Sequence, residues 1–221
     1  MRGVRSYAIV LATAVILAVF VRTWLVQAFV VPSNSMAPTL APGDHLLVNK
    51  FVFRAVMTTR LLPARRPRRG DVVVFRDPRQ PSRLLVKRCL GLPGDRVDLV
   101  DKTLIINGLA RDEAYAVYAD DRIYPSSRFL EESLRPRDNF GPLWLGDREL
   151  FCLGDHRDVS LDSRHWGPVS MDSVIGRAAL VFRRERASAA AEREGVAGED
   201  GSGDGSAAPM PTRRRVPRWV R

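Results

Sequence analysis

LLVKRCLGLPGD (Leu84–Asp95) is a short run of apolar and branched residues that ends in a Pro-Gly turn. Such a run, closed by turn-forming residues, is typical of a β-strand, and we expect a strand over residues 84–91. Lys87 lies inside this run. A free lysine has a pKa of about 10.4, and burial lowers that pKa by roughly three units. Lys87 is therefore a candidate for an uncharged amine that acts as a base.

The sequence on both sides of this run repeats the same pattern of short apolar segments and turns. Two segments joined by Asp101-Lys102 predict a β-hairpin. No long amphipathic helix is expected after the N-terminal apolar run, so the fold class is mainly β, with a closed or folded-over sheet. The other expected strands cover residues 46–53, 71–75, 149–154 and 174–182.

The N-terminus carries an uncharged apolar run from Tyr7 to Val21, preceded by Arg2 and Arg5. At about 1.5 Å per residue this run is shorter than a hydrocarbon core of roughly 30 Å. We therefore expect the helix to continue past Arg22 as a transmembrane anchor. The basic N-terminus would stay in the cytoplasm, and the domain that follows would lie outside it. The rival interpretation is a cleavable signal peptide that ends near Ala28; it also exports the domain.

Composition divides the chain into three expected parts. Residues 1–28 form the cytoplasmic tip and the anchor, and residues 29–186 form an extracytoplasmic β-rich domain. Within that domain, the polar stretch 109–145 resembles an insertion or cap. Residues 187–221 are rich in Ala, Glu, Gly, Ser and Asp, with a basic end. This tail buries little apolar surface and is predicted to be disordered.

The chain of 221 residues has a net charge of +10, with 35 Lys and Arg against 25 Asp and Glu. The arginines cluster in a loop at residues 61–70 and in the tail at residues 212–221. No nucleic-acid-binding motif accompanies them, so contact with membrane lipid is favoured over nucleic acid.

Two cysteines, Cys89 and Cys152, occur without a CxxC pair or a His/Cys cluster, so no structural metal site is predicted. Outside the cytoplasm a disulfide between them is permitted. Two buried free thiols are the alternative.

A serine hydroxyl becomes a useful nucleophile only when a base removes its proton. Ser35 lies in VPSNSMAPTL (Val31–Leu40), and a dense polar segment occupies residues 153–169. A Ser-His-Asp arrangement that uses His45, His156 or His165 and a Ser-Lys dyad that uses Lys87 are both open on the residues alone. Each of these segments taken alone is an ordinary turn or strand.

Together, in this order and behind one apolar span, the segments resemble the boxes of the bacterial type I signal peptidases. The first is similar to P-S-x-S-M-x-P-T-L, the second to K-R-x-x-G-x-P-G-D and the third to G-D-N-R-D-N-S-x-D-S-R. The likeness covers the anchor and nearly all of residues 29–183. It implies a folded-over β-sheet domain in which Ser35 is the nucleophile and Lys87 is the general base.

The resemblance implies further roles by position. Ser160 would orient the lysine amine, and Asp162 and Arg164 would form an ion pair that stiffens its loop. The Ser33 hydroxyl would join the Ser35 backbone N–H in stabilising the oxyanion. Substrate pockets would be lined by Phe29, Val31, Met36, Leu40 and Val86, which on their own are plain core residues. The chain departs from the family pattern at Asn34, His156 and Val159.

The implied function is a single-pass cell-membrane serine endopeptidase that removes signal peptides from exported preproteins at A-x-A-like sites. It would need no metal or organic cofactor. Its partners would be preproteins, membrane lipid and the export translocon, with no nucleic acid. A self-cleaving repressor would need an N-terminal DNA-binding domain, where this chain has an apolar span. A membrane-anchored binding module that has lost catalysis stays open because of Asn34 and His156.

Overall fold

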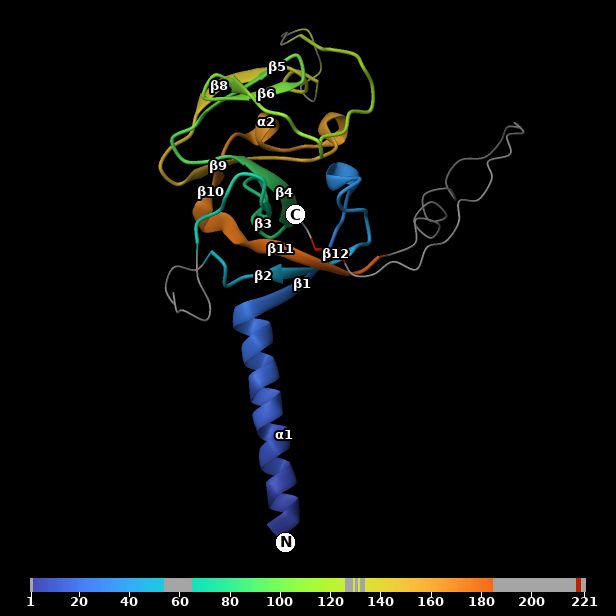
Figure 1. The fold of residues 1–221 in the computed structure, drawn as a ribbon, viewed down its shortest axis with the longest axis vertical. Helices are drawn as coiled ribbons and strands as arrows, with labels where there is room; N and C mark the ends of the chain where they lie inside the picture. Colours follow the sequence, from blue (N-terminus) through green and yellow to red (C-terminus); the bar gives the residue numbers. More distant parts are fainter. Residues whose placement is uncertain are drawn as a thin grey trace, which may run out of the picture.

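The computed structural model describes residues 2–53, 65–125, 129, 131, 134–184 and 218–219. These residues form a mainly β body built from two antiparallel sheets, with one helix projecting from it (Figure 1). The mainly β fold class predicted from the sequence is confirmed.

The larger sheet holds the lysine strand near its centre. Its strand order is β1-β2-β11-β3-β4-β9-β10, and β12 pairs with β11. The predicted strand at residues 84–91 is β4, with the expected bounds. The strands are β1 (Val26–Val30), β2 (His45–Asn49), β3 (Val72–Arg76), β4 (Leu84–Gly91), β9 (Glu149–Leu153), β10 (Val169–Ser170), β11 (Val174–Arg183) and β12 (Arg218–Trp219).

The second sheet has the order β7-β6-β5-β8 and contains the predicted hairpin. Asp101 and Lys102 form its turn, both with positive φ. Part of the stretch expected to be an irregular cap is strand instead, because β8 pairs along β5 and so satisfies its backbone groups. The strands are β5 (Arg96–Val100), β6 (Thr103–Ile106), β7 (Leu109–Ala110) and β8 (Phe140–Trp144).

Alternation along β4 decides what each of its faces contacts. Val86 packs into a cluster with Met36 and Leu40, whereas Leu85 and Cys89 pack into a different cluster with Cys152. Successive strand residues point to opposite faces, so β4 separates two apolar layers. A third cluster, centred on Leu104 and Phe151, joins the second sheet to the first.

The expected continuation of the N-terminal helix through residue 28 is wrong. Helix α1 (Arg2–Phe20) passes into a π-helical turn, η1 (Val21–Leu25), and then into β1. β1 pairs with β2 from Val26 opposite Asn49 to Val30 opposite His45. This long-range pairing overrides the local apolar pattern that favoured helix. Among the described residues, no helix combines the length and the hydropathy that a membrane crossing requires.

The remaining elements are short. They are η2 (Asn34–Met36), η4 (Arg157–Val159), α2 (Ser163–Trp166) and η5 (Met171–Ser173). The tail that was predicted to be disordered lies outside the described residues, except for residues 218–219. These two residues form β12 against β11, so the prediction of disorder is wrong for them. Residues 61–64 of the arginine-rich loop also lie outside them.

Candidate active site

The first site segment is a single turn that buries a serine. Pro32 and Ser33 are followed by the 3₁₀ turn η2, in which Ser35 is only 6% exposed. Ser33 has extended backbone angles, and its Oγ lies 3.1 Å from Ser35 Oγ. The two hydroxyls therefore form a hydrogen-bonded pair at the start of the turn.

Lys87 is a buried lysine in the middle of β4, with 3% exposure. Its Nζ donates a hydrogen bond of 2.9 Å to Ser160 Oγ. Burial is the main cause that lowers the Lys87 pKa to about 8; the charge of Asp162 opposes this change. A substantial fraction of Lys87 is consequently neutral near pH 8, which a base requires. Within the described residues, the hydrogen-bond partner of Lys87 Nζ is Ser160 and not Ser35.

The third segment holds Ser160 between two short helical turns. Asp162 caps α2 by accepting from the backbone N–H of Arg164. The two side chains also form a buried ion pair at 2.9 Å. Burial raises the Asp162 pKa, but the charge and hydrogen bonds of Arg164 prevail and lower it to about 2, with a further contribution from a Ser160 hydrogen bond. Lys87, Ser160 and Asp162 thus form one connected polar unit.

Gly154 is the place where the first and third segments come into close contact. A Cβ added there would collide with Ser160 Oγ and with the Ser35 carbonyl oxygen. The backbone N–H of His156 also donates to that carbonyl, at 3.1 Å. The Ser35 turn therefore packs directly against the loop that carries the partner of Lys87.

Arg88 joins all three segments and was missed in the sequence reasoning. Its guanidinium forms a buried ion pair of 2.6 Å with Asp155, whose Oδ2 also accepts 2.6 Å from Thr39 Oγ1. The arginine also lies over the Tyr115 ring, 4.1 Å from the centroid. An arginine within an apolar strand, together with the Gly-Asp pair at 154–155, was the available signal. A buried cation needs a buried anion as its partner.

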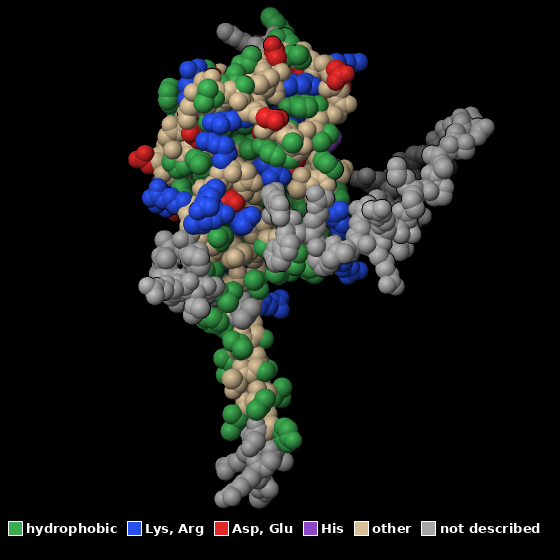
Figure 2. All heavy atoms as spheres, in the orientation of Figure 1, with side chains coloured by type: hydrophobic (Ala, Val, Ile, Leu, Met, Phe, Trp, Pro, Cys, Tyr) green, Lys and Arg blue, Asp and Glu red, His purple; other side chains and the backbone are tan. Residues whose placement is uncertain are grey.

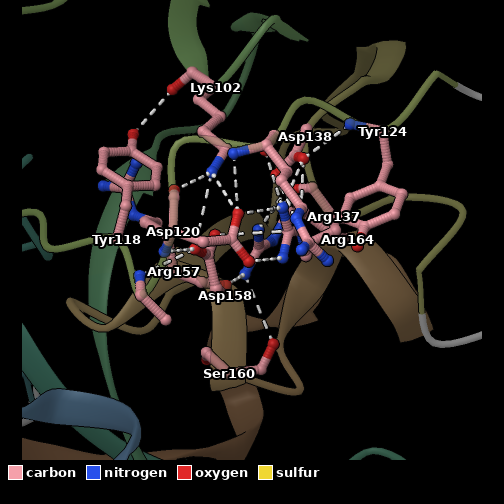
Figure 3. Close-up of polar contacts among 12 residues, drawn as sticks. Lys102, Tyr118, Asp120, Tyr124, Arg137, Asp138, Arg157, Asp158, Ser160 and Arg164 are labelled. Atoms are coloured by element: carbon pink, nitrogen blue, oxygen red, sulfur yellow. Dashed lines mark hydrogen bonds and ion pairs between the residues drawn. The ribbon is translucent and has the colours of Figure 1, made fainter.

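A group of buried arginines supports the Ser160 loop from the other side. Arg157 forms a two-pronged ion pair with Glu113, at 2.6 and 2.7 Å. Arg164 donates to the carbonyl oxygens of Arg137, Arg157 and Ser160. Figure 3 shows Arg137, Arg157 and Arg164 gathered with the carboxylates of Asp120, Asp138 and Asp158, with Ser160 at one margin of the group.

The segment around Val117 completes this support through its backbone. The N–H of Val117 donates to the Asp155 carbonyl, and its carbonyl accepts from the N–H of Arg157. The polar stretch that was expected to be a cap therefore pairs with the loop leading to Ser160.

The five residues expected to line substrate pockets lie together. The buried ones share a single apolar cluster, and Phe29 packs against it. Met36 follows Ser35 in the η2 turn, which places this cluster next to Ser35, whereas Val86 and Lys87 point to opposite faces of β4. The buried members of the cluster among the five are Val31, Met36, Leu40 and Val86.

The histidines have other contacts. The ring of His45 meets Phe182, with centroids 5.7 Å apart. His165 accepts from the backbone N–H of Asp162 through Nδ1. His156 reaches Ser35 through its backbone alone, and its buried Nδ1 has no hydrogen-bond partner within the described part of the chain. The other two departures, Asn34 and Val159, are both exposed.

Comparison with known proteins identifies a peptidase family. Residues 4–183 match the family described as "Signal peptidase, peptidase S26". Signal peptidase I of Pseudomonas aeruginosa is 35% identical over 187 residues, which cover 73% of this chain and 66% of that protein. Signal peptidase I P of Bacillus subtilis subsp. natto is 34% identical over 170 residues, which cover 76% of this chain and 83% of that protein. A crystal structure of signal peptidase I from Enterococcus faecalis is 31% identical, covers 51% of this chain and 97% of that one, and has a TM-score of 0.38.

Proposed function

Because the chain belongs to the signal peptidase family of S26 peptidases, we propose that it removes signal peptides from exported preproteins by serine–lysine hydrolysis. The observation that carries the proposal is the buried amine of Lys87, held by Ser160 beside the Ser35 turn. In that setting the Lys87 pKa is lowered to about 8, mainly by burial. An amine with a pKa near 8 has a neutral fraction close to neutral pH that can accept the proton of a serine hydroxyl.

The proposed reaction has two stages. Neutral Lys87 accepts the Ser35 hydroxyl proton while Ser35 Oγ attacks the scissile carbonyl carbon. The ammonium group then returns the proton to the leaving amine, which leaves an acyl-enzyme. Lys87 next takes a proton from water, the hydroxide attacks the ester, and Ser35 recovers its hydrogen. No metal or organic cofactor takes part in these steps.

Ser33 and the Ser35 backbone N–H are proposed to stabilise the oxyanion in both stages. The Ser33 hydroxyl lies 3.1 Å from the proposed nucleophile, so it is close to the place where the charged oxygen forms. Loss of one such donor typically lowers the rate by roughly a hundredfold or more. Ser160, Asp162 and Arg164 are proposed to hold the lysine amine in position.

Selectivity for small side chains is proposed to come from the apolar cluster next to Ser35. Met36, Leu40 and Val86 are all buried in this cluster, and we propose that a substrate side chain packs against its margin beside Ser35. Small residues at P1 and P3 suit such a surface and match the A-x-A pattern of signal sequences.

We also propose that the N-terminal segment holds the enzyme at the membrane, with the catalytic domain outside the cytoplasm. The described side chains of α1 from residue 9 to residue 20 are all exposed, and most are apolar (Figure 2). An exposed apolar surface of this kind is characteristic of a membrane or protein contact. The division of the chain into an N-terminal anchor, a peptidase domain and a tail, with the first boundary moved from residue 28 to the end of η1, and contact with an export translocon belong to the same proposal.

The function is tested with a purified preprotein whose signal sequence ends in A-x-A. Ser35→Ala and Lys87→Ala should each lose cleavage by at least about a thousandfold, whereas His156→Ala should retain most of it. Circular dichroism of all three variants checks that they are folded. Full cleavage by folded Lys87→Ala would disprove the lysine mechanism, and absence of cleavage by the wild type would favour a binding module.

A further inference from the structure

The two cysteines lie directly opposite each other across the lysine strand. Cys89 on β4 is in register with Cys152 on β9. Both side chains are fully buried and both thiols are free. A buried pair of thiols is not used in the proposed reaction, so its placement calls for a separate account.

The backbone hydrogen bonds show which kind of cross-strand pair this is. The N–H of Cys89 donates to the Asp71 carbonyl, and the Cys89 carbonyl accepts from Gly70, so both groups point away from β9. The N–H of Cys152 donates to Ser163 Oγ and not to β4. Cys89 and Cys152 are therefore a non-hydrogen-bonded pair, in which facing Cα atoms lie about 4.5 Å apart. That separation lies within the range of about 4.4 to 6.8 Å that disulfides span.

The side chains converge as well as the backbones. Cys89 and Cys152 belong to the same apolar cluster, which places both sulfur atoms on one face of the sheet. Within this cluster the Cys89 thiol donates to the Gly91 carbonyl at 3.6 Å, and the neighbouring Cys89 thiol together with burial raises the pKa of the Cys152 thiol. Closure would therefore need a rotation of the side chains and no change in the pairing of the two strands.

We propose that Cys89 and Cys152 are an oxidation site that closes into a cross-strand disulfide beside Lys87. The oxidant is a small or protein disulfide. One thiolate attacks that disulfide, forms a mixed disulfide and releases a thiolate; the second cysteine then attacks the mixed disulfide and expels the other thiolate. The chain loses two protons and two electrons, and the oxidant is reduced to two thiols.

The moment of closure follows from burial. Because both sulfur atoms are inaccessible in the folded domain, the exchange takes place while the chain folds. The location outside the cytoplasm, which is part of our proposed function, would supply the oxidising surroundings. The disulfide would lie two residues from Lys87 on β4 and two residues before Gly154 on β9. It would therefore link the strand that carries the amine to the strand that leads into the Ser160 loop.

The test uses the full chain in detergent, unfolded, and refolded with a mixture of oxidised and reduced glutathione. Remaining thiols are then alkylated with N-ethylmaleimide under denaturing conditions. We expect a mass two hydrogens lower than that of the reduced chain, no maleimide, and one linked peptide pair containing Cys89 and Cys152. Dithiothreitol should restore two maleimide sites. The oxidised form should melt about 5 to 10 °C higher than the reduced form.

Cys89→Ser and Cys152→Ser are the matched controls, because each leaves one thiol and should give one alkylation site or a glutathione adduct. Two alkylated thiols in the refolded wild type, glutathione adducts on both cysteines or intermolecular dimers would overturn the proposal. These readouts need no peptidase activity. Failure of the disulfide is therefore distinguishable from failure of the proposed function.

Discussion

The charge of Lys87 links catalysis to folding at the scale of one residue. Its pKa is lowered to about 8, mainly by burial, from the ordinary lysine value of 10.5. Between these two pH values the unfolded chain binds a proton that the folded chain does not. Folding stability therefore rises with pH across this window, and the cost of burying the ammonium group is fully present below pH 8.

Two pH dependences are expected from this one group. Cleavage by the wild type should increase with pH and reach half of its maximum near pH 8, because the neutral amine is the base in the proposed mechanism. Lys87→Met should be inactive yet more stable at pH 7, by up to about 3 kcal/mol, with a smaller advantage above pH 10. Cleavage rates and urea unfolding at several pH values measure both. A wild type and a variant with parallel stability curves would contradict the assignment.

Gly154 is a second position at which a single added atom is expected to change the rate of cleavage. A Cβ there would meet the Ser35 carbonyl and Ser160 Oγ, and neither a backbone atom nor a buried hydroxyl in a packed turn yields easily. Gly154→Ala should lower cleavage by about a hundredfold, since displacements of about 1 Å have effects of that size.

Gly146→Ala is the control for this prediction. Its added Cβ would lie 3.4 Å from the flexible carboxylate of Glu149 and should leave cleavage within about twofold of the wild type. Equal rates for the two alanine variants would show that the close approach at Gly154 does not position the site.

At the scale of elements, ion pairs hold together pieces too short to be stable alone. Turn η4 spans three residues and α2 spans four, and isolated helices of that length do not persist in water. Arg157 and Glu113 connect η4 to the chain before Val117, with side-chain exposures of 1% and 6%. Buried pairs of this kind are costly to break, because the partner that remains is an unpaired charge.

Glu113→Gln should therefore lower the free energy of unfolding by roughly 3 kcal/mol or more. Asp172→Asn breaks the ion pair between Arg148 and Asp172, whose side chains are 68% and 70% exposed. This substitution should change the free energy of unfolding by less than about 1 kcal/mol. Urea unfolding at pH 7 compares the two. The interpretation would fail if both variants were equally stable.

At the scale of the whole molecule, α1 stands apart from the β body and exposes apolar side chains (Figure 1, Figure 2). Leu11 is 67% exposed and Ile16 is 69% exposed. If α1 is seated in lipid as we propose, lysines at these positions would be opposed by roughly 2.5 to 3.5 kcal/mol each near the centre of the bilayer.

The full chain should float with phosphatidylcholine vesicles in a density gradient, and Leu11→Lys/Ile16→Lys should float far less. Leu109→Lys replaces an exposed leucine on the β7 strand and should float like the wild type. Equal flotation of the double variant would place the lipid contact elsewhere on the molecule.

The amino-acid order was sufficient for the features that local chemistry governs. The bounds of β4, the hairpin turn at Asp101-Lys102 and the mainly β class follow from apolar runs and turn residues that act over a few positions. The boxes around Ser35, Lys87 and Ser160 are likewise contiguous, so their residue types could be read directly. The roles of these residues stay predictions.

Long-range pairing decided the rest. The apolar run through residues 26–30 is as compatible with helix as with strand, and only the partner strand β2 selects strand. The same holds for β8 beside β5, for the ion pair of Arg88 with Asp155, and for Cys89 facing Cys152. These residues are separated by many positions in the chain, and hydrogen bonding and charge pairing between them depend on distances that exist only after folding.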